Sequence, residues 1–208
     1  MANNYCTLAE IKSAMADSGL ASSSDYDTII ESTITRACRA IDRWTGRAAG
    51  AYAVTSTDET TRYYTGSGCD VQWVDEMAAE PSYVGNSQDG GVSSTNYVEY
   101  STTDYYVEPP TATPYTRLVL DSINGNYHMW YKFPRSVKVT AAFGYSLSSA
   151  IPDDIVQAAI IQTVRWFKRG QQAYKDTGAI AELGQLVYTQ AVDPEVGNIL
   201  AHYRRLAI

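Results

Sequence analysis

The residue types that most often carry catalysis or bind metals are sparse in this sequence. It has only two histidines, His128 and His202, and neither has an Asp, Glu or Cys at the spacing of a metal-ligand set. The acidic residues of the middle of the chain are scattered, and nothing pairs two of them across a cleft as a glycosidase requires. The cysteines, Cys6, Cys38 and Cys69, are odd in number and form no CxxC pair, which favours reduced thiols. The sequence predicts no catalytic residue, no metal site and no cofactor.

Two short motifs resemble parts of known sites but have simpler explanations. Gly66-Ser67-Gly68 begins like a dinucleotide-binding loop, but it lacks the third glycine and no helix-forming run follows it, so a surface turn is favoured. The adjacent carboxylates of Asp153 and Asp154 follow Pro152. Proline and acidic residues are typical of the first turn of a helix, so these aspartates are expected to start a helix rather than hold a metal.

A row of arginines is the clearest candidate for binding. When a helix is drawn through the segment 26–45 at 100° per residue, one narrow sector collects basic side chains and the opposite face collects Ile30, Ile34 and Ile41. The basic residues are Arg36, Arg39, Arg43 and Arg47. Either this sector is a solvated face, or it makes ionic contacts with an acidic surface such as that of a neighbouring copy of the chain.

The elements that position these residues fall into three parts. Helices are expected at both ends, because Thr7-Leu8-Ala9-Glu10 is a capping box for a helix that ends near Gly19, and the segment 26–45 has helical periodicity and is followed by Gly46. Further helices are expected from Ile151 to Gly170 and from Asp193 to about Leu206, the latter carrying Val196, Ile199, Leu200, Tyr203 and Leu206 on one face.

Between the helices, the composition changes to Tyr, Thr, Ser and Gly, and the pattern predicts short strands. These are Thr61–Thr65, Val71–Val74, Tyr97–Tyr100, Tyr105–Val107, Thr116–Leu120, Tyr127–Tyr131 and Val137–Phe143. Asn124-Gly125 is the best candidate for a type I′ hairpin turn. We therefore predict an α+β fold, in which N-terminal helices (1–47) and C-terminal helices (151–208) form a small bundle around a central antiparallel β-rich insertion (48–150).

The overall charge limits the partners. The chain of 208 residues has 23 acidic and 16 basic side chains and a net charge of −7, and tight DNA binding requires clustered cations. Sequence-specific DNA binding is therefore not expected. Neither a signal peptide nor a membrane-spanning run is expected either.

Aromatic residues of the insertion suggest a different class of function. The chain contains 17 tyrosines and 3 phenylalanines, and Trp73 and Trp130 lie in expected strands. Exposed aromatic rings stack on sugars, so a carbohydrate-binding module is an alternative, although aromatic residues are also ordinary components of β-sheets.

Seven segments form one further ordered pattern: Tyr5–Lys12, Arg36–Arg47, Thr61–Gly66, Phe133–Tyr145, Ile151–Ile155, Phe167–Arg169 and Asp193–Arg205. Taken in this order, they resemble the head–tail adaptor (head-completion, or connector) proteins of long-tailed bacteriophages. In a phage, the alternative sugar-binding class would be a carbohydrate-binding module of a tail appendage. The segment from Asp75 to Pro114 shows no pattern of this family.

The resemblance implies a non-enzymatic virion protein at the head–tail interface, made in the host cytoplasm. It implies a homo-oligomeric ring, commonly of twelve copies, that binds the portal protein on one side and a stopper or tail-completion protein on the other. Genomic DNA would pass through the ring without sequence-specific binding. The residues at the family's portal-docking position are Tyr203, Arg204, Arg205, Leu206 and Ile208. Arg204 and Arg205 have a simpler alternative role, which is to compensate the dipole at a helix C-terminus.

Overall fold

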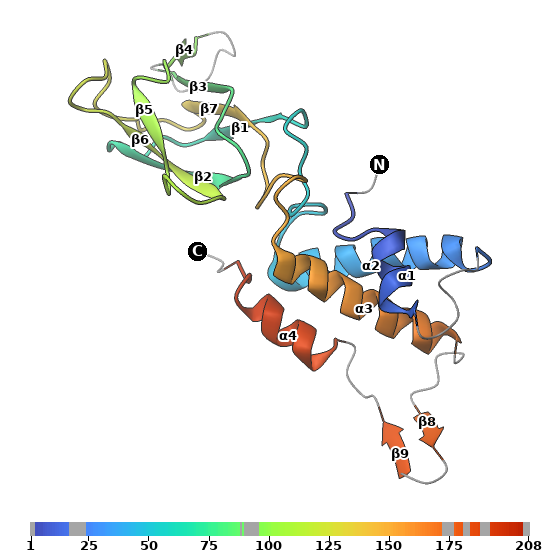
Figure 1. The fold of residues 1–208 in the computed structure, drawn as a ribbon. Helices are drawn as coiled ribbons and strands as arrows, with labels where there is room; N and C mark the ends of the chain where they lie inside the picture. The colour runs from blue at the N-terminus through green and yellow to red at the C-terminus, as the bar shows by residue number, and fades with distance from the viewer. Residues whose placement is uncertain are drawn as a thin grey trace. The chain divides into compact units, whose positions relative to one another are not determined.

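The computed structural model describes residues 3–16, 24–87, 89, 96–171, 177–180, 184–187 and 192–205. The chain divides into two compact units, a helical unit of residues 1–50 and 151–208 and a middle unit of residues 51–150 (Figure 1). Helices from both ends of the chain pack together in the first unit, and the second is built from two antiparallel sheets. The predicted α+β class, a small helical bundle with a central antiparallel β-rich insertion, is confirmed.

The two N-terminal helices begin and end where local chemistry favours it. In α1 (Leu8–Ala14), the backbone N–H of Glu10 donates to the Thr7 hydroxyl at 3.3 Å, and the Glu10 carboxylate accepts from the Thr7 N–H at 2.7 Å, so the predicted capping box is present. The helix is shorter than expected, because it ends at Met15, and Gly19 lies outside the described residues. Helix α2 (Asp27–Thr45) ends at Gly46, whose φ of 74° is the left-handed conformation that glycine adopts without strain.

The C-terminal helices are α3 (Asp153–Gln171) and α4 (Pro194–Ala201). Asp153 and Asp154 lie in the first turn of α3, as expected. The Asp193 carboxylate caps α4 by accepting from the Glu195 N–H at 3.0 Å, and it also forms an ion pair with Arg165 of α3. The expectation that α4 continues to Leu206 was wrong, because the helix ends at Ala201 with His202 as its C-cap.

Helices α2 and α3 lie side by side and form the centre of the helical unit (Figure 1). Their facing side chains are buried, among them Ile34 and Ile41 from α2 and Ile155 from α3. Trp44 and Trp166 meet edge to face, with ring centroids 6.3 Å apart. Two short strands, β8 (Thr177–Ile180) and β9 (Gly184–Val187), pair antiparallel between α3 and α4 in the chain.

The middle unit contains two antiparallel sheets. One has the order β1-β7-β3-β4 and the other the order β2-β6-β5. The strands are β1 (Thr60–Tyr64), β2 (Val71–Met77), β3 (Tyr83–Asn86), β4 (Val98–Glu99), β5 (Tyr105–Glu108), β6 (Tyr115–Leu120) and β7 (Val137–Ala141). Strand β7 has the predicted alternation, with Val137, Val139 and Ala141 buried. Side chains from both sheets meet in one core that contains Met77, Leu118 and Trp130.

Two expectations for the backbone of the middle unit were wrong, namely the strand 127–131 and the type I′ turn at Asn124-Gly125. The segment 127–131 is not a strand, because its backbone groups bond to a loop: the Trp130 N–H donates to the Cys69 carbonyl, and the Trp130 carbonyl accepts from Gly68. Asn124-Gly125 is not a type I′ turn, since neither residue has the positive φ that such a turn requires. Instead, the Asp121 carboxylate accepts from the backbone N–H groups of Ile123 and Asn124, each at 3.0 Å, and closes the turn through its side chain.

Tyr100 places an ionisable group inside this core. It is 3% exposed, and its ring stacks on that of Tyr127 with centroids 3.9 Å apart. Its hydroxyl lies near the Asn86 side chain but forms no hydrogen bond of normal geometry with it. Burial raises the pKa of Tyr100 to about 12, because the phenolate would lose its hydration.

The raised pKa sets the direction of a pH effect. The unfolded chain ionises Tyr100 near its ordinary pKa of about 10, whereas the folded chain retains the proton, so stability is lost as the pH rises from about 10 to about 12. We expect Tyr100→Phe to reduce this loss by about 2 kcal/mol or less and to leave stability at neutral pH unchanged or higher. Urea unfolding of both proteins across this pH range measures the effect. Equal losses of the free energy of unfolding between about pH 10 and about pH 12 in the two proteins would contradict the prediction.

Candidate functional site

The four arginines of the predicted basic sector line one groove in the helical unit. The groove has a volume of about 470 Å³, and Trp166 of α3 forms part of its wall. Thr35, Arg36, Arg39, Asp42 and Arg43 come from α2, and Arg47 and Ala49 follow it. Helical spacing brings the first three arginines to one face, and Arg47, which follows the left-handed C-cap at Gly46, lines the same groove.

Two of the arginines are used to hold the helical unit together. Arg39 donates to the Asn3 carbonyl at 2.6 Å and forms an ion pair with Asp42 at 3.0 Å, and its guanidinium lies 5.8 Å from the centre of the Tyr5 ring. Arg47 donates to the Tyr203 carbonyl, so it joins the end of α2 to the C-terminal segment. Both guanidinium groups therefore have internal partners.

Arg36 and Arg43 are different, because both are exposed. The guanidinium of Arg36 lies 5.7 Å from the centre of the Trp166 ring, a cation–π contact that leaves its N–H groups available. Neither Arg36 nor Arg43 forms an ion pair with any residue that the structure describes. The groove therefore holds two guanidinium groups whose charge is not neutralised within the described part of the chain.

Asp42 is the buried anion beneath the groove, and our sequence reasoning missed it. It is 2% exposed, accepts from the Tyr5 hydroxyl and from the Gly50 N–H at 3.0 Å, and pairs with Arg39. One sequence signal could have revealed it: Asp42 follows Cys38 by four residues and therefore falls on the apolar stripe of the helix. A carboxylate on that stripe requires a buried partner.

The C-terminal segment contains the residues that the resemblance assigns to portal docking. Tyr203, Arg204 and Arg205 follow α4 instead of lying on it, and Leu206 and Ile208 are outside the described residues. The Tyr203 hydroxyl donates to Asp154 at 3.3 Å, and the Arg205 N–H donates to the Thr45 carbonyl at 2.9 Å. Arg204 is exposed, and no ion pair links it to a described residue.

Of the two tryptophans considered from the sequence as a sugar-stacking surface, Trp73 is exposed and Trp130 is not. Trp130 is fully buried and donates its indole N–H to the Asp70 carbonyl at 2.9 Å, so the interpretation of Trp130 as a stacking surface was wrong. Trp73 is 59% exposed, with Arg117 at 5.1 Å from its ring centre. Sequence reasoning also missed a cluster in which Lys138 lies 4.7 Å from the ring centre of Tyr83 and 5.8 Å from that of Tyr97.

The other candidates for chemistry have structural roles. The Cys6 thiol donates to the sulfur of Cys38, which raises the pKa of Cys6 and lowers that of Cys38, and both residues are buried as free thiols. Gly66 lies where a Cβ atom would be 2.0 Å from the Tyr131 carbonyl oxygen, so close packing explains this glycine without a phosphate loop. No group of three or more His, Cys, Asp or Glu side chains that could hold a metal ion occurs among the described residues. Within the same residues, no helix has the length and hydropathy needed to cross a bilayer.

Fold and site together define a two-unit α+β chain in which a helical unit carries a basic groove and is interrupted in sequence by a β-rich unit. No protein-family model matches the sequence, and no curated protein matches it significantly. Solved structures share the fold. One is a chain in the neck of an empty gene transfer agent (GTA) particle computed with C6 symmetry; the alignment has 16% identity, covers 97% of this chain and 90% of that one, and has a TM-score of 0.57. Another is a chain in the virion of a native GTA particle, at 17% identity, with the same coverage and a TM-score of 0.51.

Proposed function

We propose that this protein is a structural component of the neck of a phage-like particle, where copies form a ring that joins the portal to the stopper or tail. The observation that carries the proposal is the likeness of the fold, over 97% of this chain, to a chain in the neck of an empty GTA particle. The order of the sequence motifs that resemble head–tail adaptors supports the same assignment independently. The function is mechanical: the protein links the head to the tail and leaves a channel for DNA.

The charge distribution is compatible with this role. The net charge of −7 would keep DNA from adhering to a channel that the ring surrounds, because strong binding to phosphates depends on clustered cations. A ring also requires that each copy present two different complementary faces. We assign one of these faces to the arginines of the groove, which are Arg36, Arg39, Arg43 and Arg47.

The copy number in purified particles tests the assignment. We expect quantitative mass spectrometry to find this chain and the portal protein in a ratio near one, at about a dozen copies each. Absence of the chain from the particle, or a copy number that follows the tail fibres, would contradict a role in the neck.

We assign portal binding to the C-terminal segment, which comprises Tyr203, Arg204, Arg205, Leu206 and Ile208. Arg204 is the sharpest probe because it is exposed and has no ion-pair partner among the described residues, whereas the backbone of Tyr203 and Arg205 is bonded to the end of α2. We expect Arg204→Glu to weaken binding to purified portal rings at least about tenfold without unfolding the chain. Lys168→Glu, the same charge change at an exposed residue of α3, is the matched control, and equal binding by both variants would refute the assignment.

The exposed ring of Trp73 favours a second candidate, a sugar-binding surface on the middle unit. Glycan-array binding that is lost in Trp73→Ala would support it. No binding by the unmodified protein would remove it.

A further inference from the structure

We propose that the groove between α2 and Trp166 is a carboxylate-binding site, in which Arg36 and Arg43 bind acidic side chains from the middle unit of a second copy. The inference rests on the proposed ring and names the partner surface of one of its contacts. Its first support is the difference among the four arginines. Arg39 and Arg47 are bound internally, so the ligand-binding capacity of the groove lies with Arg36 and Arg43.

The groove wall holds the guanidinium of Arg36 in place. Arg36 lies against the face of Trp166, which in turn packs on Trp44, so its planar fork is held at the wall. Asp42 is the single carboxylate among the groove residues that the structure describes. It is buried and already bound by Tyr5, Arg39 and Gly50, so it does not neutralise Arg36 and Arg43. A planar guanidinium fork matches a carboxylate through two parallel N–H···O bonds, which gives such a site geometric selectivity.

The middle unit supplies the complementary charge. Residues 51–150 contain eleven acidic and five basic residues, whereas acidic and basic residues nearly balance in the helical unit. Two of the five cations are already paired, Arg62 with Asp75 and Arg117 with Glu108. The basic residues of this unit are therefore too few to neutralise its carboxylates.

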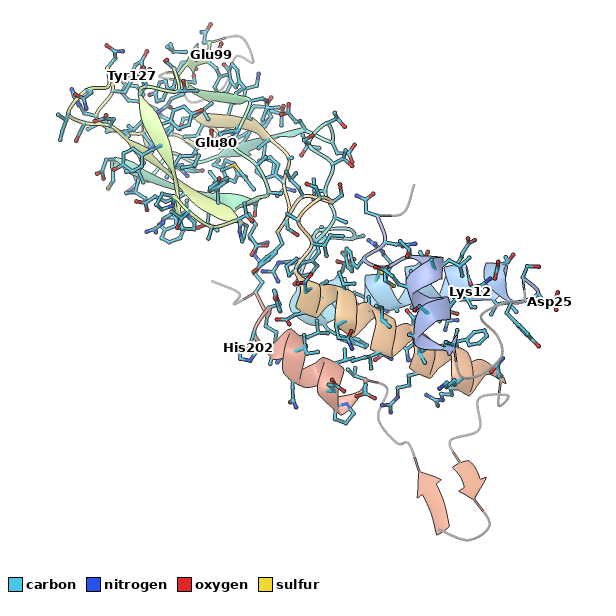
Figure 2. All side chains as sticks on the ribbon, in the orientation of Figure 1. Lys12, Asp25, Glu80, Glu99, Tyr127 and His202 are labelled. Atoms are coloured by element: carbon cyan, nitrogen blue, oxygen red, sulfur yellow. The ribbon has the colours of Figure 1, made fainter. Side chains whose placement is uncertain are left out.

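Glu80 and Glu99 are the best candidates for the acidic surface. Both are exposed side chains of the middle unit (Figure 2), and neither forms an ion pair with a described residue. Both carboxylates also raise the pKa of Tyr105, after the larger effect of its burial. A basic groove on one unit and an acidic surface on the other are the two unlike faces that a head-to-tail ring requires.

A zero-length cross-link tests the contact directly. Arg43→Lys keeps the charge and introduces an amine, which a carbodiimide joins only to a carboxylate in contact with it. We expect an equal mixture of nitrogen-15-labelled and unlabelled full-length variant to yield peptides in which Lys at position 43 is joined to Glu80 or Glu99 of a differently labelled copy. Failure to form that link, a link within one copy only, or a link to an acidic residue of the helical unit would overturn the proposal.

A charge reversal supplies the second measurement. We expect Arg36→Glu combined with Arg43→Glu to weaken self-association in sedimentation equilibrium by about tenfold or more, because it removes two charge-assisted contacts. Lys132→Glu combined with Lys168→Glu is the matched control, since it changes the net charge equally at exposed positions outside the groove. Equal association of the two double variants would overturn the proposal.

A phosphate ligand is the remaining alternative occupant. Retention of the unmodified protein, but not of the groove variant, on duplex DNA would overturn the carboxylate assignment in favour of phosphate. These outcomes do not test the proposed function. That proposal is tested by the presence and copy number of the chain in purified particles.

Discussion

Replacing Asp42 by alanine is expected to lower the free energy of unfolding by about 3–5 kcal/mol. The substitution removes the acceptor for the Tyr5 hydroxyl and the Gly50 N–H, and it leaves the Arg39 guanidinium without its counter-charge. Tyr5 and Gly50 are both buried, so water cannot easily replace the lost hydrogen bonds. Chemical denaturation followed by far-UV circular dichroism measures the effect.

Arg43→Ala is the matched control for Asp42, because Arg43 follows it directly in α2 but is exposed. We expect this control to change the free energy of unfolding by no more than about 0.5 kcal/mol. Asp42→Asn should fall between the two, since it keeps one acceptor oxygen while it removes the charge. A loss for Asp42→Ala as small as that of the control would show that the buried carboxylate does not hold the N-terminal segment to α2.

Replacing Trp130 by alanine is expected to destabilise the middle unit by about 3–5 kcal/mol. The side chain is fully buried in the core that both sheets share, so the substitution leaves a large cavity. It also removes the indole N–H bond to the Asp70 carbonyl, which keeps its second bond from the Leu120 N–H. Differential scanning calorimetry resolves the effect even where the two units unfold in separate transitions.

Trp73→Ala provides the comparison for Trp130, because it removes the same side chain from an exposed position in β2. We expect it to change the free energy of unfolding by about 1 kcal/mol or less, which corresponds to the loss of its contact with Arg117. Similar losses for the two variants would contradict the assignment of Trp130 to the core and of Trp73 to the surface.

The helices were largely predictable from the sequence because their signals are local. The capping box at Thr7, the glycine after Thr45 and the aspartates at the start of α3 act within one or two turns, and all are found as expected. The end of α4 was missed, because Tyr203 and Arg205 bond to the end of α2 instead of continuing the helix. Such partners are distant in sequence, and periodicity does not reveal them.

The errors in the strands have the same origin. Strand β3 contains Gly85 and Asn86, which have low strand propensity, and it forms because β7 and β4 pair with it on either side. The aromatic run 127–131 has high strand propensity but no strand beside it, and its backbone bonds to the loop around Gly68 and Cys69 instead. In both segments, the presence or absence of a neighbouring strand outweighed the strand propensity of the residues.

The sequence predicted which arginines share the candidate site, but not which of them are bound within the protein and which are available to a partner. Helical spacing brought Arg36, Arg39 and Arg43 to one face, as the sequence indicated. The sequence did not reveal that Arg39 bonds to Asn3, since these residues lie 36 positions apart. The pairing of Arg47 with Tyr203 spans 156 positions and was equally hidden. The distinction between structural and available arginines therefore required the tertiary structure.

The first and last residues of the middle unit are bonded to each other, and this affects the order in which the chain can fold. The Tyr145 N–H donates to the Ala51 carbonyl at 2.7 Å, and Val54 pairs with Leu147, so the two ends of this unit are held together once it has folded. Helices α2 and α3 pack on each other although the whole middle unit separates them in the chain. If the middle unit folds first, a loop of about a hundred residues is replaced by a short one, which reduces the entropic cost of joining α2 to α3 by about 2 kcal/mol. A β-rich unit that folds first would thus bring the ends of α2 and α3 together, and a nascent chain can complete the bundle only after α3 has been synthesised.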